Sequence, residues 1–149
     1  MTTPADDLRT AGLKVTAGRV GVLDEIGSSP HSDADRLHGM MRARGHSLSL
    51  QSVHNVLRDL TTANLLRRIE PANSPARYER RVDDNHHHVV CTRCDAIADV
   101  DCVVGHAPCL HPSDAAGFSI ATAEVTFWGL CADCTTASST LIPATQGES

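Results

Sequence analysis

The sequence predicts an α+β protein built from two small domains, and three observations support this prediction. Apolar residues recur at helical spacing through most of residues 1–82, whereas short runs typical of strands dominate residues 86–149. Residues 1–81 carry 12 Lys and Arg against 9 Asp and Glu, a net charge of +3. The remaining residues carry Arg93 alone against 9 acids, a net charge of −8. We therefore expect a hinge over residues 83–85 and different partners for the two domains.

Three helices are expected in the first domain. The first follows Thr16, a preferred N-cap residue, and its apolar face contains Val20, Leu23 and Ile26. The second is expected to begin at Ser32, which has an acid three residues later in a capping pattern, and to end at Gly45. The third follows Ser49 and has an apolar stripe of Val53, Val56, Leu57 and Leu60. Two short strands around the turn PANSP complete the domain.

Two successive helices followed by a β-hairpin predict a winged helix-turn-helix domain over residues 1–82. In this arrangement the second helix of the pair enters the major groove of DNA. Polar side chains that lie off its apolar stripe are candidate DNA contacts: Ser49, Gln51, Ser52, His54, Asn55 and Arg58. Gln and Asn can bind adenine through two hydrogen bonds, and Arg58 can bind guanine or phosphate. Candidate phosphate contacts in the arm and wing are Lys14, Arg19, Arg67, Arg68 and Arg77. The alternative is a solvated helix face without a partner.

The second domain is expected to be a small α/β unit. Its predicted strands are residues 86–91, 96–101 and 118–128, with a short helix from Val103 into the 110s. The chain has no apolar run of about 18 residues, so no membrane span is expected. Its first residues lack the pattern of a secretory signal, so the expected location is cytoplasmic.

Six cysteines in a cytoplasmic protein favour metal ligands or redox groups over disulfides. Cys91 and Cys94 form one C-x-x-C pair, and Cys131 and Cys134 form another after 36 intervening residues. Four thiolates in two such pairs predict a closed tetrahedral Zn²⁺ site that has a structural role. The alternatives are a redox-active C-x-x-C pair or two unrelated surface pairs.

Two cysteines remain outside this framework, Cys102 and Cys109. They are either buried small hydrophobic residues or a redox pair of thiols that oxidises to a disulfide.

Three adjacent histidines precede the first cysteine pair. If residues 86–91 form a strand, His86 and His88 point to one face and His87 points to the other. Two imidazoles on one face predict a second metal site with nitrogen and oxygen ligands. Such a site suits Fe²⁺, Mn²⁺, Co²⁺, Ni²⁺ or Zn²⁺.

An ordered set of motifs resembles the ferric uptake regulator family. It consists of LKVTAGRVGVL, PHSDADRL, SLQSVHNVLRDLTTANLL, ARYE, HHHVVCTRC, IADVD, GFSIATAEV and WGLCADC, and it covers roughly residues 8–134. The resemblance is strongest to the actinobacterial branch that represses catalase-peroxidase genes and its own gene.

The resemblance implies a homodimeric repressor whose dimerisation domain, residues 86–149, is stapled by zinc. The ligands that it implies for a regulatory metal are His31, Glu79, His86 and His88, with Asp99 as a possible fifth. Fe²⁺ or Mn²⁺ is the expected ion, and Zn²⁺ or Ni²⁺ can substitute. An accessory site of some members would use His87, but its other positions are Asn85, His106 and Ala123, which is an incomplete ligand set. His54 also departs from the family, which usually has Tyr there.

These features predict a metal-dependent, redox-responsive repressor of peroxide-defence genes that binds a palindromic operator in double-stranded DNA. The alternative is a sensor of metal concentration that does not respond to peroxide. Within the first hypothesis, oxidant acts on the histidines of an Fe²⁺ site, on Cys102 and Cys109, or on the zinc site. Neither a membrane nor a small organic substrate is an expected partner.

Two other classes of protein are weighed against a repressor. A zinc enzyme would need an open coordination position and a general base, and the sequence has neither H-E-x-x-H nor H-x-E with P-C-x-x-C. A metal-buffering protein would lack the steep salt dependence of DNA binding. The sequence therefore favours a regulator over an enzyme.

Overall fold

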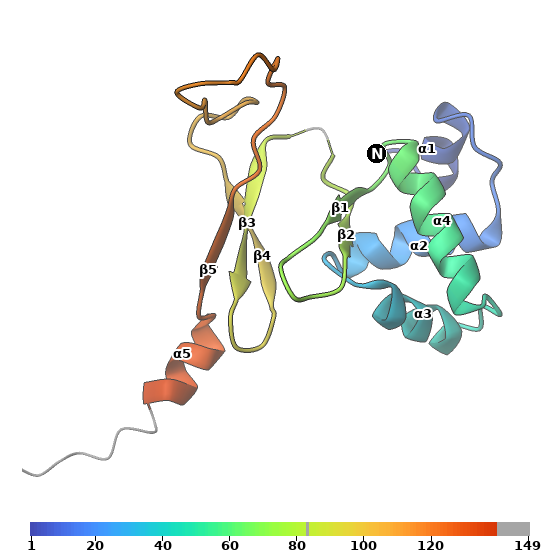
Figure 1. The fold of residues 1–149 in the computed structure, drawn as a ribbon. Helices are drawn as coiled ribbons and strands as arrows, with labels where there is room; N and C mark the ends of the chain where they lie inside the picture. The colour runs from blue at the N-terminus through green and yellow to red at the C-terminus, as the bar shows by residue number, and fades with distance from the viewer. Residues whose placement is uncertain (83, 140–149) are drawn as a thin grey trace, which may run out of the picture. The chain divides into compact units, whose positions relative to one another are not determined.

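The computed structural model describes residues 1–82 and 84–139 (Figure 1). The chain divides into two compact units, residues 1–83 and 84–149. The hinge expected at residues 83–85 includes Asp83, which lies outside the described residues.

The N-terminal unit contains four helices and a two-stranded antiparallel sheet (Figure 1). In chain order these are α1 (Pro4–Thr10), α2 (Ala17–Ser28), α3 (Ala34–Ala43), α4 (Leu50–Thr62), β1 (Arg67–Ile69) and β2 (Arg77–Glu79). The predicted order of helix, turn, helix and hairpin is therefore confirmed. The sheet register pairs Arg68 with Tyr78.

Helix α1 was not expected from the sequence. Thr3 and Asp6 form a capping box, because the Thr3 hydroxyl accepts the Asp6 N–H while the Asp6 carboxylate accepts the Thr3 N–H. Pro4 occupies the first position of the helix, where its missing N–H costs nothing. Leu8 is fully buried and attaches the helix to the core of the unit.

The expected N-caps of α2 and α4 are confirmed, whereas that of α3 was wrong. Thr16 and Ser49 each accept a backbone N–H from three residues later, at 3.2 and 3.1 Å. Asp33 caps α3 by accepting the Arg36 N–H at 2.8 Å. Ser32 lies one residue before this cap, and its hydroxyl donates to the Ser29 carbonyl at 2.7 Å instead.

We expect Asp33→Ala to lower the free energy of unfolding by about 1 kcal/mol, because it leaves an N–H of α3 without its side-chain acceptor. Thermal or urea unfolding followed by circular dichroism measures this loss. Asp33→Asn is the control, since its side-chain oxygen keeps the cap and should keep most of the stability. Equal losses in the two variants would show that the acceptor oxygen shared by Asp and Asn is not what stabilises the helix.

One apolar core holds the N-terminal unit together. Its fully buried members come mainly from α2, α3 and α4, and they include Val22, Leu23, Ile26, Leu37, Met41, Val53, Leu57 and Leu60. The core leaves the polar face of α4 exposed at Gln51, His54, Asn55 and Arg58.

The C-terminal unit is built on a three-stranded sheet in the order β4-β3-β5 (Figure 1). Strand β3 (His86–Cys91) is central, with β4 (Ile97–Asp101) antiparallel and β5 (Thr126–Gly129) parallel to it. Helix α5 (Ala132–Ser139) follows β5 directly. Strand β3 has the predicted bounds, and β4 begins one residue later than expected.

Two predictions for this unit were wrong. The segment after Val103 forms a loop, because Gly105 adopts a positive φ of 77° and Pro108 has no N–H to continue a helix. Strand β5 spans Thr126–Gly129 and shares only residues 126–128 with the expected range of 118–128, since its ladder begins opposite His88 of β3. Among the described residues, no helix is long and apolar enough to cross a membrane.

Candidate metal centres and DNA-facing helix

The parallel pairing of β3 with β5 brings the two C-x-x-C pairs together. Cys91 ends β3 opposite Gly129, and Cys131 follows two residues after that glycine. Asp95 has a positive φ of 61° and closes a turn in which its N–H donates to the Cys91 carbonyl at 3.0 Å. Cys94 lies in this turn, and Cys134 lies in the first turn of α5. The four predicted zinc ligands therefore form one cluster.

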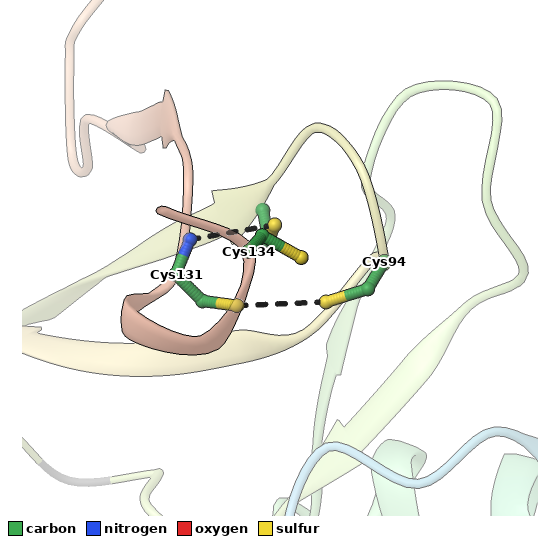
Figure 2. A group of neighbouring side chains, drawn as sticks. Cys94, Cys131 and Cys134 are labelled. Carbon is green, nitrogen blue, oxygen red and sulfur yellow. Dashed lines mark hydrogen bonds between the residues drawn. The ribbon is translucent and has the colours of Figure 1, made fainter. Parts of the chain in front are cut away.

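The spacing of the four sulfur atoms fits a tetrahedral Zn²⁺ ion. All four lie within 4.8 Å of one another. The sulfurs of Cys94 and Cys131 face each other at 3.7 Å, with Cys134 beside them (Figure 2). A Zn–S bond of about 2.3 Å places tetrahedral sulfur ligands about 3.8 Å apart, so this distance is the one that the ion requires.

The charges in this cluster also favour a bound cation. The backbone N–H of Cys131 donates to the Cys91 sulfur at 3.4 Å, and such N–H groups lower the pKa of Cys91 to about 6. The hydrogen bond between the thiols of Cys134 and Cys131 raises the pKa of Cys134 to about 12, and burial adds to this rise. Thiolates this close repel one another, so a dication is what allows all four to ionise together.

The five predicted regulatory ligands occur as two groups, one in each unit. In the N-terminal unit, His31 Nε2 lies 3.1 Å from the Glu79 carboxylate. The backbone fixes this pair, because the His31 N–H donates to the Tyr78 carbonyl at 2.9 Å and Arg77 donates to the His31 carbonyl at 3.2 Å. His31 also adopts a left-handed backbone with φ 63°. Such a conformation is uncommon outside glycine and is often found at functional sites.

Glu79 is a buried carboxylate at the end of β2. Only 1% of its surface is exposed, and its second oxygen lies 4.0 Å from Arg67 Nε. A buried charge of this kind needs partners, and a cation or a positively charged side chain can supply them.

In the C-terminal unit, His86, His88 and Asp99 form the second group. The imidazoles lie on one face of β3 with ring centroids 4.9 Å apart, as strand alternation predicted. Asp99 of β4 pairs with His88 in the sheet register. Its carboxylate oxygen Oδ1 lies 3.7 Å from His86 Nε2 and 3.5 Å from His88 Nε2, so both imidazoles face the same carboxylate oxygen.

Asp84 orients His86, and sequence reasoning missed it. Its carboxylate lies 2.7 Å from His86 Nδ1. A carboxylate in this position holds the ring and its tautomer so that Nε2 presents a lone pair, which is the usual support for a metal-binding histidine. A carboxylate two residues before a candidate ligand was the available signal.

The opposite face of β3 holds a different set of groups. His87 Nε2 lies 3.2 Å from the sulfur of Cys109, and Cys102 completes the cluster. The two candidate redox thiols are therefore close together. Of the incomplete accessory set, Asn85 donates to the backbone carbonyl of His106 at 2.9 Å, and the His106 ring lies 3.2 Å from the Val104 carbonyl.

Helix α4 presents the candidate DNA contacts on its exposed face. Ser49 and Ser52 bond to each other through their hydroxyls at 2.9 Å while capping the helix. Gln51 donates to Asn55 at 3.2 Å, which orients both amides along the surface. His54 and Arg58 are exposed beside them. Which of these side chains contact DNA stays a prediction.

The arginines that flank this face make contacts within the unit. Arg19 bonds to Asp59 of α4 at 3.1 Å and to the Lys14 carbonyl at 2.8 Å, so it ties α2 to α4. Arg68 of the hairpin pairs with Glu70 at 2.6 Å. The exposed side chain of Lys14 lies just before α2. Phosphate binding by these residues also stays a prediction.

Comparison with known proteins supplies the observation that decides the family. The model of the Ferric uptake regulator family matches residues 10–127, most of the chain. The chain belongs to the ferric uptake regulator family. Transcriptional regulator FurA of Mycobacterium bovis is 53% identical over 130 residues, which cover 87% of this chain and 88% of that protein. Ferric uptake regulation protein 2 of Mycolicibacterium fortuitum is 46% identical over 145 residues, covering 93% and 99%.

Solved structures of ferric uptake regulators share the fold. The Vibrio cholerae regulator aligns with a TM-score of 0.65 at 21% identity and covers 85% of this chain and 98% of that one. The Francisella tularensis regulator aligns with a TM-score of 0.66 at 20% identity, covering 83% and 96%. The predicted α+β class and the prediction of a metal-responsive transcriptional regulator rather than an enzyme are therefore confirmed.

Proposed function

We propose that this ferric uptake regulator is a metal-dependent, redox-responsive repressor of peroxide-defence genes, including catalase-peroxidase genes and its own gene. It acts as a homodimer on a palindromic operator. The observation that carries the proposal is that each unit holds a group of nitrogen and oxygen donors that suits a cation. His31 and Glu79 form the group of the N-terminal unit, and His86, His88 and Asp99 form that of the C-terminal unit.

The chemistry of these five side chains supports a regulatory cation. Three imidazoles and two carboxylates suit Fe²⁺ or Mn²⁺, which prefer nitrogen and oxygen ligands, and Zn²⁺ or Ni²⁺ can substitute. In this proposal one divalent cation takes ligands from both groups, so that metal binding favours one state of the chain. Solved relatives carry iron in Francisella tularensis and manganese in Pseudomonas aeruginosa. His31 and Glu79 belong to the same unit as α4, so metal binding at these residues can change the affinity of that unit for DNA.

We assign a structural role to the four-cysteine cluster and a recognition role to α4. Zinc on Cys91, Cys94, Cys131 and Cys134 closes the sheet of a dimerisation domain that comprises residues 86–149. The exposed face of α4 enters the major groove, and the two helices of a dimer bind two half-sites about one helical turn apart. The N-terminal residues 1–82 form the DNA-binding domain.

The test of metal dependence begins by selecting a DNA sequence that the protein binds, because the operator sequence is not known. The Mn²⁺-loaded protein selects binding sites from a pool of random duplexes, and fluorescence anisotropy then measures affinity for the selected duplex before and after mild chelation. We expect chelation to weaken binding by about 5- to 150-fold, the usual range of coupling between two sites. Zinc on the cysteines is measured in parallel and should be retained. Unchanged affinity after loss of the Mn²⁺ would contradict the proposal.

A variant on α4 tests the recognition role. We expect Asn55→Ala to weaken binding to the selected duplex by about 1–3 kcal/mol, because an amide that reads adenine loses two hydrogen bonds. Binding to a scrambled duplex should change little, since phosphate contacts dominate there. Asp24→Asn, a polar change on α2, is the control and should leave both affinities intact. Equal losses on both duplexes would assign Asn55 to the phosphate backbone instead.

The second candidate is a sensor of metal concentration, which the name of the 46% identical relative favours. Treatment of the Fe²⁺-loaded protein with hydrogen peroxide, followed by mass spectrometry, distinguishes the two. Oxygen added to His31 or His86, or a disulfide between Cys102 and Cys109, supports redox sensing. An unmodified chain with metal-dependent DNA binding supports the concentration sensor.

A further inference from the structure

The cluster of His87, Cys102 and Cys109 has the geometry of a metal site. One imidazole nitrogen and the two sulfurs all lie within 4.8 Å of one another. Cys109 Sγ lies 3.2 Å from His87 Nε2. With Zn–S about 2.3 Å and Zn–N about 2.0 Å, a tetrahedral ion separates a sulfur from a nitrogen ligand by about 3.5 Å, so the donors are close to the positions that one ion requires.

The loop that joins the two cysteines is shaped to bring them together. Cys102 directly follows β4, and Cys109 returns seven residues later after a turn at Gly105. Asn85 donates to the carbonyl of His106 at 2.9 Å, which fastens this loop beside the start of β3. The two thiols thus converge on the face of β3 that carries His87.

The surroundings of Cys102 and His87 suit a bound cation. The backbone N–H of Gly105 lowers the pKa of Cys102, with a further contribution from the N–H of Val104, and the thiolate is the form that binds metal. His87 is buried, with 7% of its surface exposed. Its ring packs edge-on against Phe127 of β5, with ring centroids 6.5 Å apart. The imidazole is therefore fixed in position by the sheet.

We propose that His87, Cys102 and Cys109 bind a thiophilic divalent cation of the Zn²⁺ class, at a site separate from the four-cysteine cluster. Strand β3 also separates the new site from the regulatory donors, because His86 and His88 lie on its other face with Asp99. Three protein donors leave the fourth tetrahedral position for water or another ligand, unlike the closed four-cysteine site. The proposal does not depend on DNA binding, since its test measures metal on the protein alone.

Cobalt provides the test because Co²⁺ replaces Zn²⁺ and gives sulfur-to-metal charge-transfer bands only where thiolates bind it. The full-length chain is stripped of metal under reducing conditions and titrated with Co²⁺. We expect the wild type to bind one more equivalent of thiolate-bound Co²⁺ than Cys102→Ser/Cys109→Ser. The regulatory ligands are nitrogen and oxygen donors, so ions there add nothing to these bands.

Two further variants make the result specific. His87→Asn should lose the nitrogen ligand and weaken binding of the additional equivalent at least tenfold, with circular dichroism confirming the fold. His106→Ala is the matched control, since it removes a histidine of the same loop whose ring contacts Val104 instead of the cluster. The control should retain the full number of equivalents.

Alkylation gives an independent readout if a variant fails to fold. With the wild type, one equivalent of Zn²⁺ beyond that needed by the four-cysteine cluster should protect Cys102 and Cys109 from iodoacetamide, as peptide mass spectrometry would show. The proposal is overturned if both thiols react equally with and without this zinc. It is also overturned if the wild type and the double serine variant bind the same number of thiolate-bound Co²⁺ ions.

Discussion

Cys131→Ser is expected to remove one zinc ion per chain and to unfold the segment that contains β5 and α5. Cys131 joins the second cysteine pair to the end of β3, and its backbone N–H also donates to Cys91. Structural zinc contributes about 10–16 kcal/mol of binding free energy in small domains, comparable to or larger than the whole stability of a typical domain. The C-terminal unit should therefore lose its cooperative unfolding transition. Zinc analysis and hydrogen exchange at residues 126–137 measure the two effects.

A matched variant distinguishes loss of this ion from loss of any thiol. Cys102→Ser removes a cysteine of the same unit outside the four-cysteine cluster. It should keep the zinc of that cluster and the protection of β5. A strong chelator should reproduce the effect of Cys131→Ser on the wild type. If Cys131→Ser retained both zinc and a normal unfolding transition, a structural role for this site would be excluded.

Glu79→Gln is expected to abolish the activation of DNA binding by Mn²⁺ while leaving metal-free binding nearly unchanged. The substitution keeps the size of the side chain but removes the negative charge that lies 3.1 Å from His31. The cation then loses a charged ligand, and the difference of about 5- to 150-fold between loaded and chelated protein should disappear. Anisotropy titrations with and without Mn²⁺ measure this difference.

Glu70→Gln is the control for the change of charge. Glu70 is an exposed acid next to β1 that pairs with Arg68. Its replacement alters the net charge by the same amount and should preserve the response to Mn²⁺. Loss of DNA binding by Glu79→Gln even without metal would instead indicate damage to the hairpin, because Glu79 is buried there.

Local signals predicted those parts of the fold that depend on neighbouring residues. The apolar stripe of α4 and the alternation of β3 predicted which side chains are buried and which faces His86 and His87 occupy. The paired C-x-x-C motifs predicted a cluster of four thiols, which the β3–β5 pairing assembles. Periodicity and fixed spacing were therefore reliable for α4, β3 and the cysteine pairs, whereas residues 118–125 were expected to form a strand and do not.

Features that depend on distant residues were not predictable in the same way. Two adjacent residues, Ser32 and Asp33, are both suitable caps of α3, and the sequence does not reveal that Asp33 is the one that accepts the Arg36 N–H. The loop between Cys102 and Cys109 follows from one positive φ and one proline, whereas the apolar residues around them suggested a helix. The contact of Cys109 with His87 depends on how that loop folds back, and the spacing of the two residues in the sequence does not predict it.

The alternation of β3 makes this strand unusually sensitive to insertions and deletions. Adding or removing a single residue among the three histidines would shift the register of β3 by one residue, so each histidine would point to the opposite face of the sheet. The imidazoles beside Asp99 would then exchange places with the one beside Cys109. Both sets of donors would be disrupted at once, although the histidine tract itself would look almost unaltered. Length variation within the family should therefore concentrate in the loops on either side and spare this strand.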